Sequence, residues 1–259
     1  MSAGAGRHAV ITGAGTGIGR AIALRLASEG ARLSLFARDE NRLRETAEAA
    51  RAKGSAGVHV ARCDVREREQ VDRAFEAAAR ELGPISVCVA NAGIGGPNEP
   101  GERDRFDALV ATNLTGAYSC LRAAQARLAP GPGTRHLIAV ASVLARIGVA
   151  GYTGYCASKA GLLGLVRALA KELAPQNVQV NAVCPGWVNT EMAHQGLEGM
   201  ARSMGVTVEE AHRIAMSEVP LGRMGEPEDV AGLVAWLASD DARGVTGQGI
   251  DMNGGAFMI

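Results

Sequence analysis

The sequence is poor in aromatic residues, which make up only 3% of its 259 positions, with two tryptophans, three tyrosines and four phenylalanines. Because 47% of the residues are hydrophobic, the core has to be built mainly from aliphatic side chains. We expect a single domain spanning residues 1–259, since one α/β sheet commonly reaches this size.

An excess of either charge is also missing. Lysine plus arginine and aspartate plus glutamate balance at 27 each, which argues against nucleic acid or an acidic membrane as the main partner. No apolar run approaches the roughly 18 residues of a membrane span, and the N-terminus lacks the pattern of a signal peptide. We therefore expect a cytoplasmic protein that binds neither nucleic acid nor membrane.

Cysteine and histidine are sparse and scattered. The five cysteines form no Cys-x-x-Cys pair and are odd in number, so reduced thiols in the core are expected rather than a disulfide framework. The five histidines form no close set with cysteine, so no metal site is predicted.

Short β-branched runs alternate with segments of helical periodicity along the chain. We predict strands at 8–12, 31–37, 58–64, 84–93, 135–142, 177–186 and 248–255. The predicted helices lie at 18–28, 41–54, 67–82, 104–128, 155–174 and 228–238. This order predicts an α/β fold with a doubly wound, parallel, seven-stranded sheet and helices on both faces, as in Rossmann-like proteins. The weakly periodic stretch 191–220 is predicted to be an inserted lid.

Glycines occupy positions 13, 15, 17 and 19 directly after the first predicted strand, in the stretch TGAGTGIG. This spacing fits G-x-x-x-G-x-G and does not fit G-x-G-x-x-G. Residues without a Cβ let backbone N–H groups approach a diphosphate at a helix N-terminus. The alternative is a tight strand-to-helix turn without a ligand.

The second predicted strand ends in Phe36-Ala37-Arg38-Asp39, where a dinucleotide fold presents the residue that selects the ribose. The guanidinium of Arg38 would clamp a 2′-phosphate there, which favours NADP(H) while leaving NAD(H) open. The alternative for Arg38 is a solvated charge at the strand end. Asp39 is expected to cap the next helix.

The stretch GYTGYCASKAG at 151–161 contains two tyrosines and one lysine. Because helix positions four apart share a face, Lys159 can meet Tyr155 but not Tyr152. The alternative for this pair is an ordinary contact on a helix surface.

Taken in order, the motifs resemble the short-chain dehydrogenase/reductase superfamily in its single-domain branch. They are TGAGTGIG, ANAG at 90–93, Asn113 in TNLTG, Ser142, YCASK, PGWVNT at 185–190 and the closing DMNGG, and they cover essentially the whole chain. Within the superfamily the sequence is most similar to 3-oxoacyl thioester reductases, and its lid resembles that of polyketide ketoreductases.

The resemblance implies a catalytic set of Asn113, Ser142, Tyr155 and Lys159. Tyr155 would be the acid in carbonyl reduction and the base in alcohol oxidation. Lys159 would favour the phenolate and bind the nicotinamide ribose, while Ser142 would orient the substrate oxygen. Asn113 would hold a water that links Lys159 to solvent.

The resemblance also implies how the cofactor is held. Asp64 would accept from the adenine amino group with Val65 beside it. The full implied cofactor set is Gly13, Gly15, Thr16, Gly17, Ile18, Gly19, Arg38, Asp64, Val65, Asn91, Ala92, Gly93, Tyr155, Lys159, Pro185, Gly186, Val188 and Thr190. Two positions depart from the family: many NADP-preferring relatives have a basic residue where this chain has Thr16, and the usual Asn-Asn-Ala-Gly begins here with Ala90.

These features predict an NADPH-dependent oxidoreductase that interconverts a ketone and a secondary alcohol by hydride transfer. The substrate would be a small molecule, such as a 3-oxoacyl thioester or polyketide ketone linked to a carrier protein or coenzyme A. An apolar substrate pocket would be lined by Ser142, Leu144, Tyr152, Tyr155, Trp187 and Met192, and the basic candidates for its mouth are Arg127, Arg146 and Arg202.

Two alternatives remain open at this stage. One is a secondary-alcohol, sugar or steroid dehydrogenase that uses either cofactor, and the other is a non-catalytic dinucleotide sensor. Since the family is commonly tetrameric, a homotetramer is expected, with the predicted helices 104–128 and 155–174 pairing between subunits.

Overall fold

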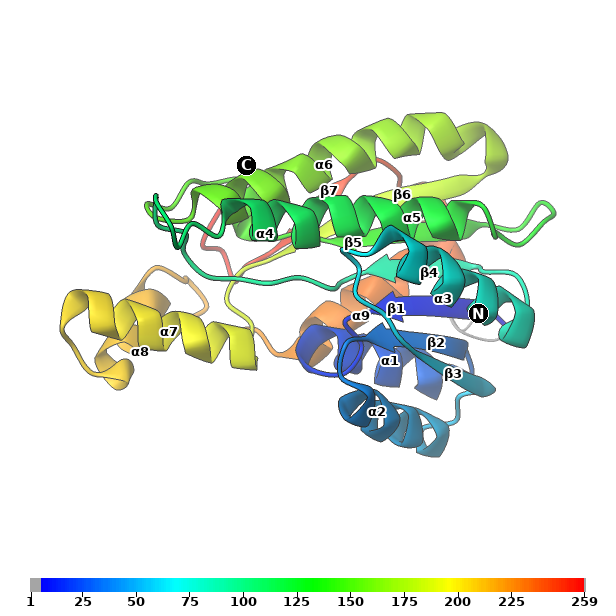
Figure 1. The fold of residues 1–259 in the computed structure, drawn as a ribbon, viewed down its shortest axis with the longest axis horizontal. Helices are drawn as coiled ribbons and strands as arrows, with labels where there is room; N and C mark the ends of the chain where they lie inside the picture. The colour runs from blue at the N-terminus through cyan, green and yellow to red at the C-terminus, as the bar shows by residue number, and fades with distance from the viewer. Residues whose placement is uncertain (1–5, 259) are drawn as a thin grey trace.

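The computed structural model describes residues 6–258 and contains a seven-stranded sheet in the order β3-β2-β1-β4-β5-β6-β7 (Figure 1). Its strands are β1 (His8–Thr12), β2 (Arg32–Ala37), β3 (Gly57–Arg62), β4 (Val87–Ala90), β5 (Arg135–Val140), β6 (Val178–Pro185) and β7 (Gly249–Met252). All neighbouring strands pair in parallel. The prediction of a doubly wound parallel sheet is therefore confirmed.

Helices cover both faces of the sheet, which explains why strands such as β6 are buried at every residue. One face is covered by α3 (Arg68–Leu82), α5 (Gly116–Gln125) and α6 (Thr153–Leu173), and the other by α1 (Gly17–Ser28), α2 (Glu40–Ala52) and α9 (Pro227–Leu237). The sequence-predicted helices and strands match these elements, with ends that differ by a few residues.

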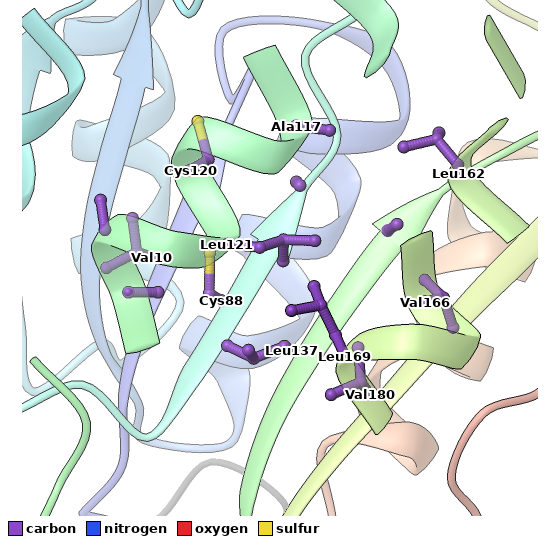
Figure 2. Close-up of a cluster of buried hydrophobic side chains, with 14 of the residues drawn as sticks. Val10, Cys88, Ala117, Cys120, Leu121, Leu137, Leu162, Val166, Leu169 and Val180 are labelled. Carbon is purple, nitrogen blue, oxygen red and sulfur yellow. The ribbon is translucent and has the colours of Figure 1, made fainter. Parts of the chain in front are cut away.

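Aliphatic and thiol side chains fill the interface between the sheet and the helices α5 and α6 (Figure 2). The strands contribute Val10, Cys88, Leu137 and Val180, α5 contributes Cys120 and Leu121, and α6 contributes Leu162, Val166 and Leu169. All five cysteines are free, and four of them are buried. The expected core of reduced thiols and aliphatic residues is thus present.

The predicted helix at 104–128 is interrupted. It consists of α4 (Phe106–Val110), a π turn (Ala111–Thr115) and α5, and it ends at Gln125. The residues at both junctions keep right-handed helical backbone angles, so the segment continues as a helix with one widened turn. Asn113 lies in that turn and is buried.

The predicted lid is more regular than its sequence suggests. It forms α7 (Glu191–Met204) and α8 (Val208–Ser217), which project to one side of the sheet (Figure 1). Thr190 and Thr207 cap the two helices by accepting backbone N–H groups. The pair has its own small core, formed by Ala193, Leu197, Ala215, Met216, Val219 and Met224 with Trp187 and Met200 packed against it.

Candidate active site

The predicted site residues gather at the carboxyl ends of the parallel strands. Strand order reverses between β1 and β4, which is where a doubly wound sheet opens a crevice for a ligand. The glycine loop follows β1, the Asn91 turn follows β4, Ser142 follows β5 and Gly186 follows β6. The sheet topology therefore brings together motifs that are far apart in the sequence.

The side chains of Ser142 and Tyr155 lie close together, near enough for Ser142 to lower the pKa of the Tyr155 phenol. Ser142 stands at the end of β5, where its hydroxyl also accepts from the backbone N–H of Leu144 at 3.2 Å. Tyr155 lies in the first turn of α6, which begins at Thr153. Two hydroxyl groups from different elements are thus held beside one point, where both can reach a single substrate oxygen.

Lys159 is only 5% exposed and lies on the same side of α6 as Tyr155, as the spacing predicted. Its Nζ is 5.7 Å from the centre of the Tyr155 ring and donates to the carbonyl oxygen of Val140 at 2.8 Å. Burial lowers the pKa of Lys159 to about 8. A buried lysine with a lowered pKa beside a phenol is typical of a functional site.

Burial raises the pKa of Tyr155 above its ordinary value of 10, and the nearby Ser142 side chain opposes this effect. The phenol is therefore protonated at neutral pH. In this state Tyr155 is equipped to give a proton to a substrate oxygen.

Asn113 has two partners that the sequence did not reveal, Ile94 and Ser158. Its Oδ1 accepts from the N–H of Ile94 at 2.8 Å, and its Nδ2 donates to the carbonyl oxygen of Ile94 at 3.0 Å and to Ser158 Oγ at 3.1 Å. The side chain thereby fixes the loop after β4. If Gly93 carried a Cβ atom, that atom would lie 3.1 Å from Asn113 Oδ1 and 3.6 Å from Lys159 Nζ. The turn at Gly93 therefore lies beside both polar groups.

The glycine loop provides a cradle that only glycine can form. A Cβ on Gly19 would lie 2.2 Å from the carbonyl oxygen of Gly13, and Gly13 itself has a φ of +65°. The loop leads into α1, whose first turn contains no acidic residue, with Thr16 as N-cap and Ile18 half-buried. Free N–H groups at such a helix start suit the diphosphate of a dinucleotide.

Thr12 joins this loop to the turn after β4. Its Oγ1 accepts from the backbone N–H groups of Asn91 at 3.1 Å and Ala92 at 3.0 Å, while Asn91 Nδ2 donates to the Thr12 carbonyl oxygen at 2.9 Å. Thr12 was not predicted as a site residue. Its position as the last residue of the first strand is the signal that could have found it.

At the predicted adenine end, the Asp64 carboxylate is already engaged. Arg66 holds both carboxylate oxygens, with an Nη2–Oδ2 distance of 2.6 Å, and this hydrogen bonding lowers the pKa of Asp64. The Asp64 N–H donates to Gln70 Oε1 at 3.1 Å. Val65 packs beneath Gly116, where a Cβ would lie 2.7 Å from Val65 Cγ2. Arg66 was missed because it follows Asp64 in a loop without periodicity.

Arg38 is exposed at the end of β2. Within residues 6–258 its side chain makes no hydrogen bond or ion pair, and its charge helps to lower the pKa of Asp64. Asp39 caps α2 as expected, since its Oδ1 accepts from Asn41 N at 2.9 Å and Arg42 N at 3.2 Å. Arg38 is thus an exposed charge directly after β2, near the Asp64 carboxylate but without an ion pair.

The segment after β6 closes the other side of the crevice. Pro185 is the last residue of β6, and the N–H of Gly186 donates to the carbonyl oxygen of Met252 at 3.0 Å. Val188 forms an isolated bridge with Gly225. A Cβ on Gly17 would lie 3.2 Å from Thr190 Cγ2, so the start of α7 touches the glycine loop.

The four predicted apolar pocket residues fall into two groups. Leu144 and Tyr152 are half-buried and flank the Ser142 and Tyr155 positions. Trp187 instead packs beneath α7, with its ring 3.5 Å from a Cβ on Gly196. Met192 is 44% exposed, and its sulfur would lie 2.9 Å from a Cβ on Gly95, so the lid touches the loop after β4.

Two of the three basic residues considered for the mouth of the site are engaged within the fold. Arg127 donates to the carbonyl oxygens of Ala123 and Asp72, and Arg146 pairs with Asp251 at 3.2 Å. Arg202 remains exposed on α7 near Glu198, at 4.0 Å. The first two arginines are structural because their guanidinium groups satisfy partners within the fold.

No group of three or more histidine, cysteine, aspartate or glutamate side chains is arranged for a metal ion in the part of the chain that the structure describes. Among residues 6–258, no helix is both long and apolar enough to span a membrane.

Comparison with known proteins identifies the class of this fold and site. A family model described as enoyl-(acyl carrier protein) reductase matches residues 13–256. A Streptomyces violaceoruber protein named as a ketoacyl reductase of the granaticin polyketide synthase is 39% identical over 95% of this chain and 92% of its own length. The 3-oxoacyl-[acyl-carrier-protein] reductase FabG of Staphylococcus aureus is 32% identical over 97% of this chain and 98% of its own.

Among solved structures, a tryptophan variant of actinorhodin polyketide ketoreductase with NADPH superimposes with a TM-score of 0.90. It is 36% identical, and the match covers 96% of this chain and 97% of that one. The chain belongs to the short-chain dehydrogenase/reductase family, as its motifs predicted. It is an oxidoreductase that uses a nicotinamide dinucleotide and interconverts a ketone and a secondary alcohol.

Proposed function

We propose that this enzyme is an NADPH-preferring reductase of a 3-oxoacyl thioester or a related polyketide ketone. The observation that carries the proposal is that the side chains of Ser142 and Tyr155 lie together, with the buried Lys159 Nζ 5.7 Å from the centre of the Tyr155 ring. A non-catalytic dinucleotide sensor would need the glycine cradle but not these hydroxyl groups.

In the proposed reduction, Tyr155 donates its phenolic proton to the carbonyl oxygen of the substrate. Ser142 donates a hydrogen bond to the same oxygen and orients it. The ammonium group of Lys159 stabilises the phenolate that forms, because an opposite charge nearby lowers the pKa of a phenol. A bound nicotinamide dinucleotide supplies the hydride for the carbonyl carbon.

The roles of the remaining residues follow from their positions. The glycine cradle and the free N–H groups at the start of α1 would hold the diphosphate. Lys159 would also contact the nicotinamide ribose, and the segment at 185–190 would bracket the nicotinamide. The side chain of Asn113 is already engaged in fixing the neighbouring loop. Asn113 would therefore take part in proton supply through the backbone of the widened turn that it occupies.

The preference for NADPH is inferred from Arg38. A guanidinium without an intramolecular partner can form a charge-assisted fork with a 2′-phosphate. Ala37, which precedes it, offers no carboxylate to accept from the ribose hydroxyls that NADH would present.

The apolar character of Leu144, Tyr152 and Met192 favours an acyl or polyketide chain over a free sugar. Secondary-alcohol and steroid dehydrogenase activities are the competing function, because these substrates would fit the same hydroxyl pair. Thioester substrates attached to a carrier protein or coenzyme A are favoured by the names of relatives that match this chain along its length.

We further infer that the chain forms one domain and assembles as a homotetramer. Ala157, Ala160, Gly164 and Ala168 leave an exposed face of small residues along α6 that permits close approach of a second helix. Gly161 lies between these residues in the sequence, but it packs against Leu114 within the same chain. Light scattering of the purified protein tests the assembly, and a monomer would refute it.

The function is tested by following NADPH and NADH oxidation separately with acetoacetyl thioesters, diketones, simple ketones and a 2-enoyl thioester. NADPH-linked turnover of the 3-oxoacyl thioester supports the proposal, and its transfer to NADH in Arg38→Ala assigns the cofactor preference. Turnover confined to simple ketones, or to the enoyl thioester, would overturn the substrate assignment. Equal use of both cofactors would overturn the preference.

A further inference from the structure

Two segments that are distant in sequence, the start of α2 and the start of α7, lie against the glycine loop. A Cβ on Gly15 would lie 3.1 Å from Arg42 Cβ, and Thr46 Oγ1 donates to the carbonyl oxygen of Gly15 at 3.5 Å. The first turns of α2 therefore lie against the loop. On its other side, Thr190 at the start of α7 contacts Gly17.

Arg42 connects these two segments through its charge. Its Nη1 lies 3.0 Å from Glu191 Oε2, and its Nε lies 3.6 Å from Asp39 Oδ2. Glu191 is the first residue of the lid helix α7. The ion pair therefore ties the lid to the side of the crevice where the ribose selector Arg38 lies, four residues before Arg42.

The ion pair between Arg42 and Glu191 is weak enough for a more highly charged group to displace Glu191. The Arg42 side chain is 47% exposed and the Glu191 side chain 61% exposed, and ion pairs between such groups contribute little stability. A phosphate monoester carries up to two negative charges at neutral pH and accepts a bidentate guanidinium fork. A 2′-phosphate held by Arg38 would therefore compete with Glu191 for Arg42.

We propose that Arg42 is a second determinant of NADPH specificity, shared between the 2′-phosphate of the cofactor and Glu191 of the lid. This inference rests on the proposed NADPH preference. Arg42 supplies the second positive charge that the glycine loop lacks at Thr16. Binding of the 2′-phosphate withdraws Arg42 from Glu191 and so releases the first turn of α7, while Glu191 moderates the affinity for that phosphate.

The test uses adenosine 2′,5′-bisphosphate and adenosine 5′-monophosphate, which differ only in the 2′-phosphate. Calorimetric Kd values measured with the full-length protein isolate that group without any turnover. Arg42→Ala should weaken the bisphosphate about tenfold and leave the monophosphate unchanged, because a charge-assisted hydrogen bond is lost. Glu191→Gln should strengthen the bisphosphate about two- to fivefold, because Arg42 no longer has a competing partner.

A double-mutant cycle separates competition from simple repulsion. If Glu191 acts through Arg42, the gain in Glu191→Gln disappears in the Arg42→Ala background. A gain that persists there would mean that Glu191 repels the phosphate directly, and would overturn the proposal. Glu40→Gln is the matched control, since it removes the acidic partner of Arg44 at 3.2 Å on the same helix and should leave both Kd values unchanged.

Hydrogen exchange provides a second readout. The backbone N–H of Ala193, which Thr190 caps, should exchange faster in the bisphosphate complex than in the monophosphate complex. Equal exchange in both complexes would refute the release of α7. If the wild type binds both nucleotides equally, the proposed NADPH preference fails together with this inference. If it prefers the bisphosphate through Arg38 but not Arg42, only this inference fails.

Discussion

Arg146 and Asp251 form an ion pair with an Nε–Oδ1 distance of 3.2 Å, which ties the turn after Ser142 to strand β7. Both side chains are less than one-fifth exposed, and Arg146 Nη2 also donates to the carbonyl oxygen of Gly249 at 2.7 Å. The turn also packs on itself, since the N–H of Arg146 donates to the carbonyl oxygen of Val143 at 2.8 Å. The edge of the sheet therefore supports the position of Ser142.

Asp251→Asn should lower both kcat and stability. The change leaves the partly buried guanidinium of Arg146 without its charged partner, which costs about 1–3 kcal/mol of unfolding free energy. A displaced Ser142 turn should lower kcat about tenfold, since small misplacements of catalytic groups are costly. Ketone turnover and urea unfolding measure the two effects, with the surface change Asp72→Asn as control. Reduced stability with full kcat would limit this pair to a structural role.

Tyr155→Phe should lower kcat by roughly a hundred- to ten-thousandfold, because the substrate oxygen loses its proton donor. Cofactor binding should persist, since the phenyl ring is retained. Tyr152→Phe removes the neighbouring hydroxyl and should retain most of the activity. Steady-state kinetics of the two variants distinguishes the tyrosines, and equal losses would contradict the assignment of Tyr155.

The rate of reduction should fall as the pH rises through about 8. Burial lowers the pKa of Lys159 to about 8, so the ammonium that stabilises the Tyr155 phenolate is present below this pH and lost above it. An arginine keeps its charge over this pH range. Lys159→Arg should therefore abolish the fall in rate above about pH 8, even if kcat is reduced. A pH–rate profile from about 6 to 10 tests the assignment, and an unchanged limb in the variant would place it on another group.

Acid should destabilise the protein through His136. Burial lowers its pKa to about 4, whereas the unfolded chain binds a proton near the ordinary value of 6.5. Since the unfolded state binds more protons between these values, stability is complete above 6.5 and declines as the pH falls to 4, by up to about 3 kcal/mol.

The change His136→Leu should remove this part of the pH dependence, because both ring nitrogens of His136 are buried without a hydrogen-bond partner. Urea unfolding in mild acid, near pH ~5, and at neutral pH, at one protein concentration, measures the difference. The exposed His212→Gln is the control, and an identical acid loss in His136→Leu would assign the effect elsewhere, for instance to the buried His8.

The sheet was predictable because its strands are short, β-branched and buried on both faces, as in β6. The lid helices were not predictable. The buried residues of α7 are only Ala193, Leu197 and Ala201, and because two of these three are alanine, the hydrophobic periodicity is weak. The π turn at 111–115 was hidden for a different reason. A widened turn depends on tertiary contacts, here those of Asn113 with Ile94 and Ser158, and leaves no mark on hydrophobic spacing.

In the candidate site, motif order placed Ser142, Tyr155 and Lys159 near one another, because strand ends and helix faces follow from local sequence. The pairing of each arginine with a particular carboxylate could not be predicted from the sequence. The partner of Asp64 is Arg66, two residues away, whereas the partner of Arg42 is 149 residues away at Glu191. Which arginine is free and which is engaged depends on side-chain geometry that composition and spacing do not encode.

The π turn also sets the phase between the two halves of its helix. Such a turn holds one residue more than an α-helical turn, and each helical residue rotates the chain by about 100°. Deleting one residue from 111–115 would therefore restore regular winding, but would turn α4 relative to α5 and carry Asn113 away from Ile94. A shortened chain of this kind would gain a regular helix but lose the contacts that Asn113 makes with Ile94 and Ser158.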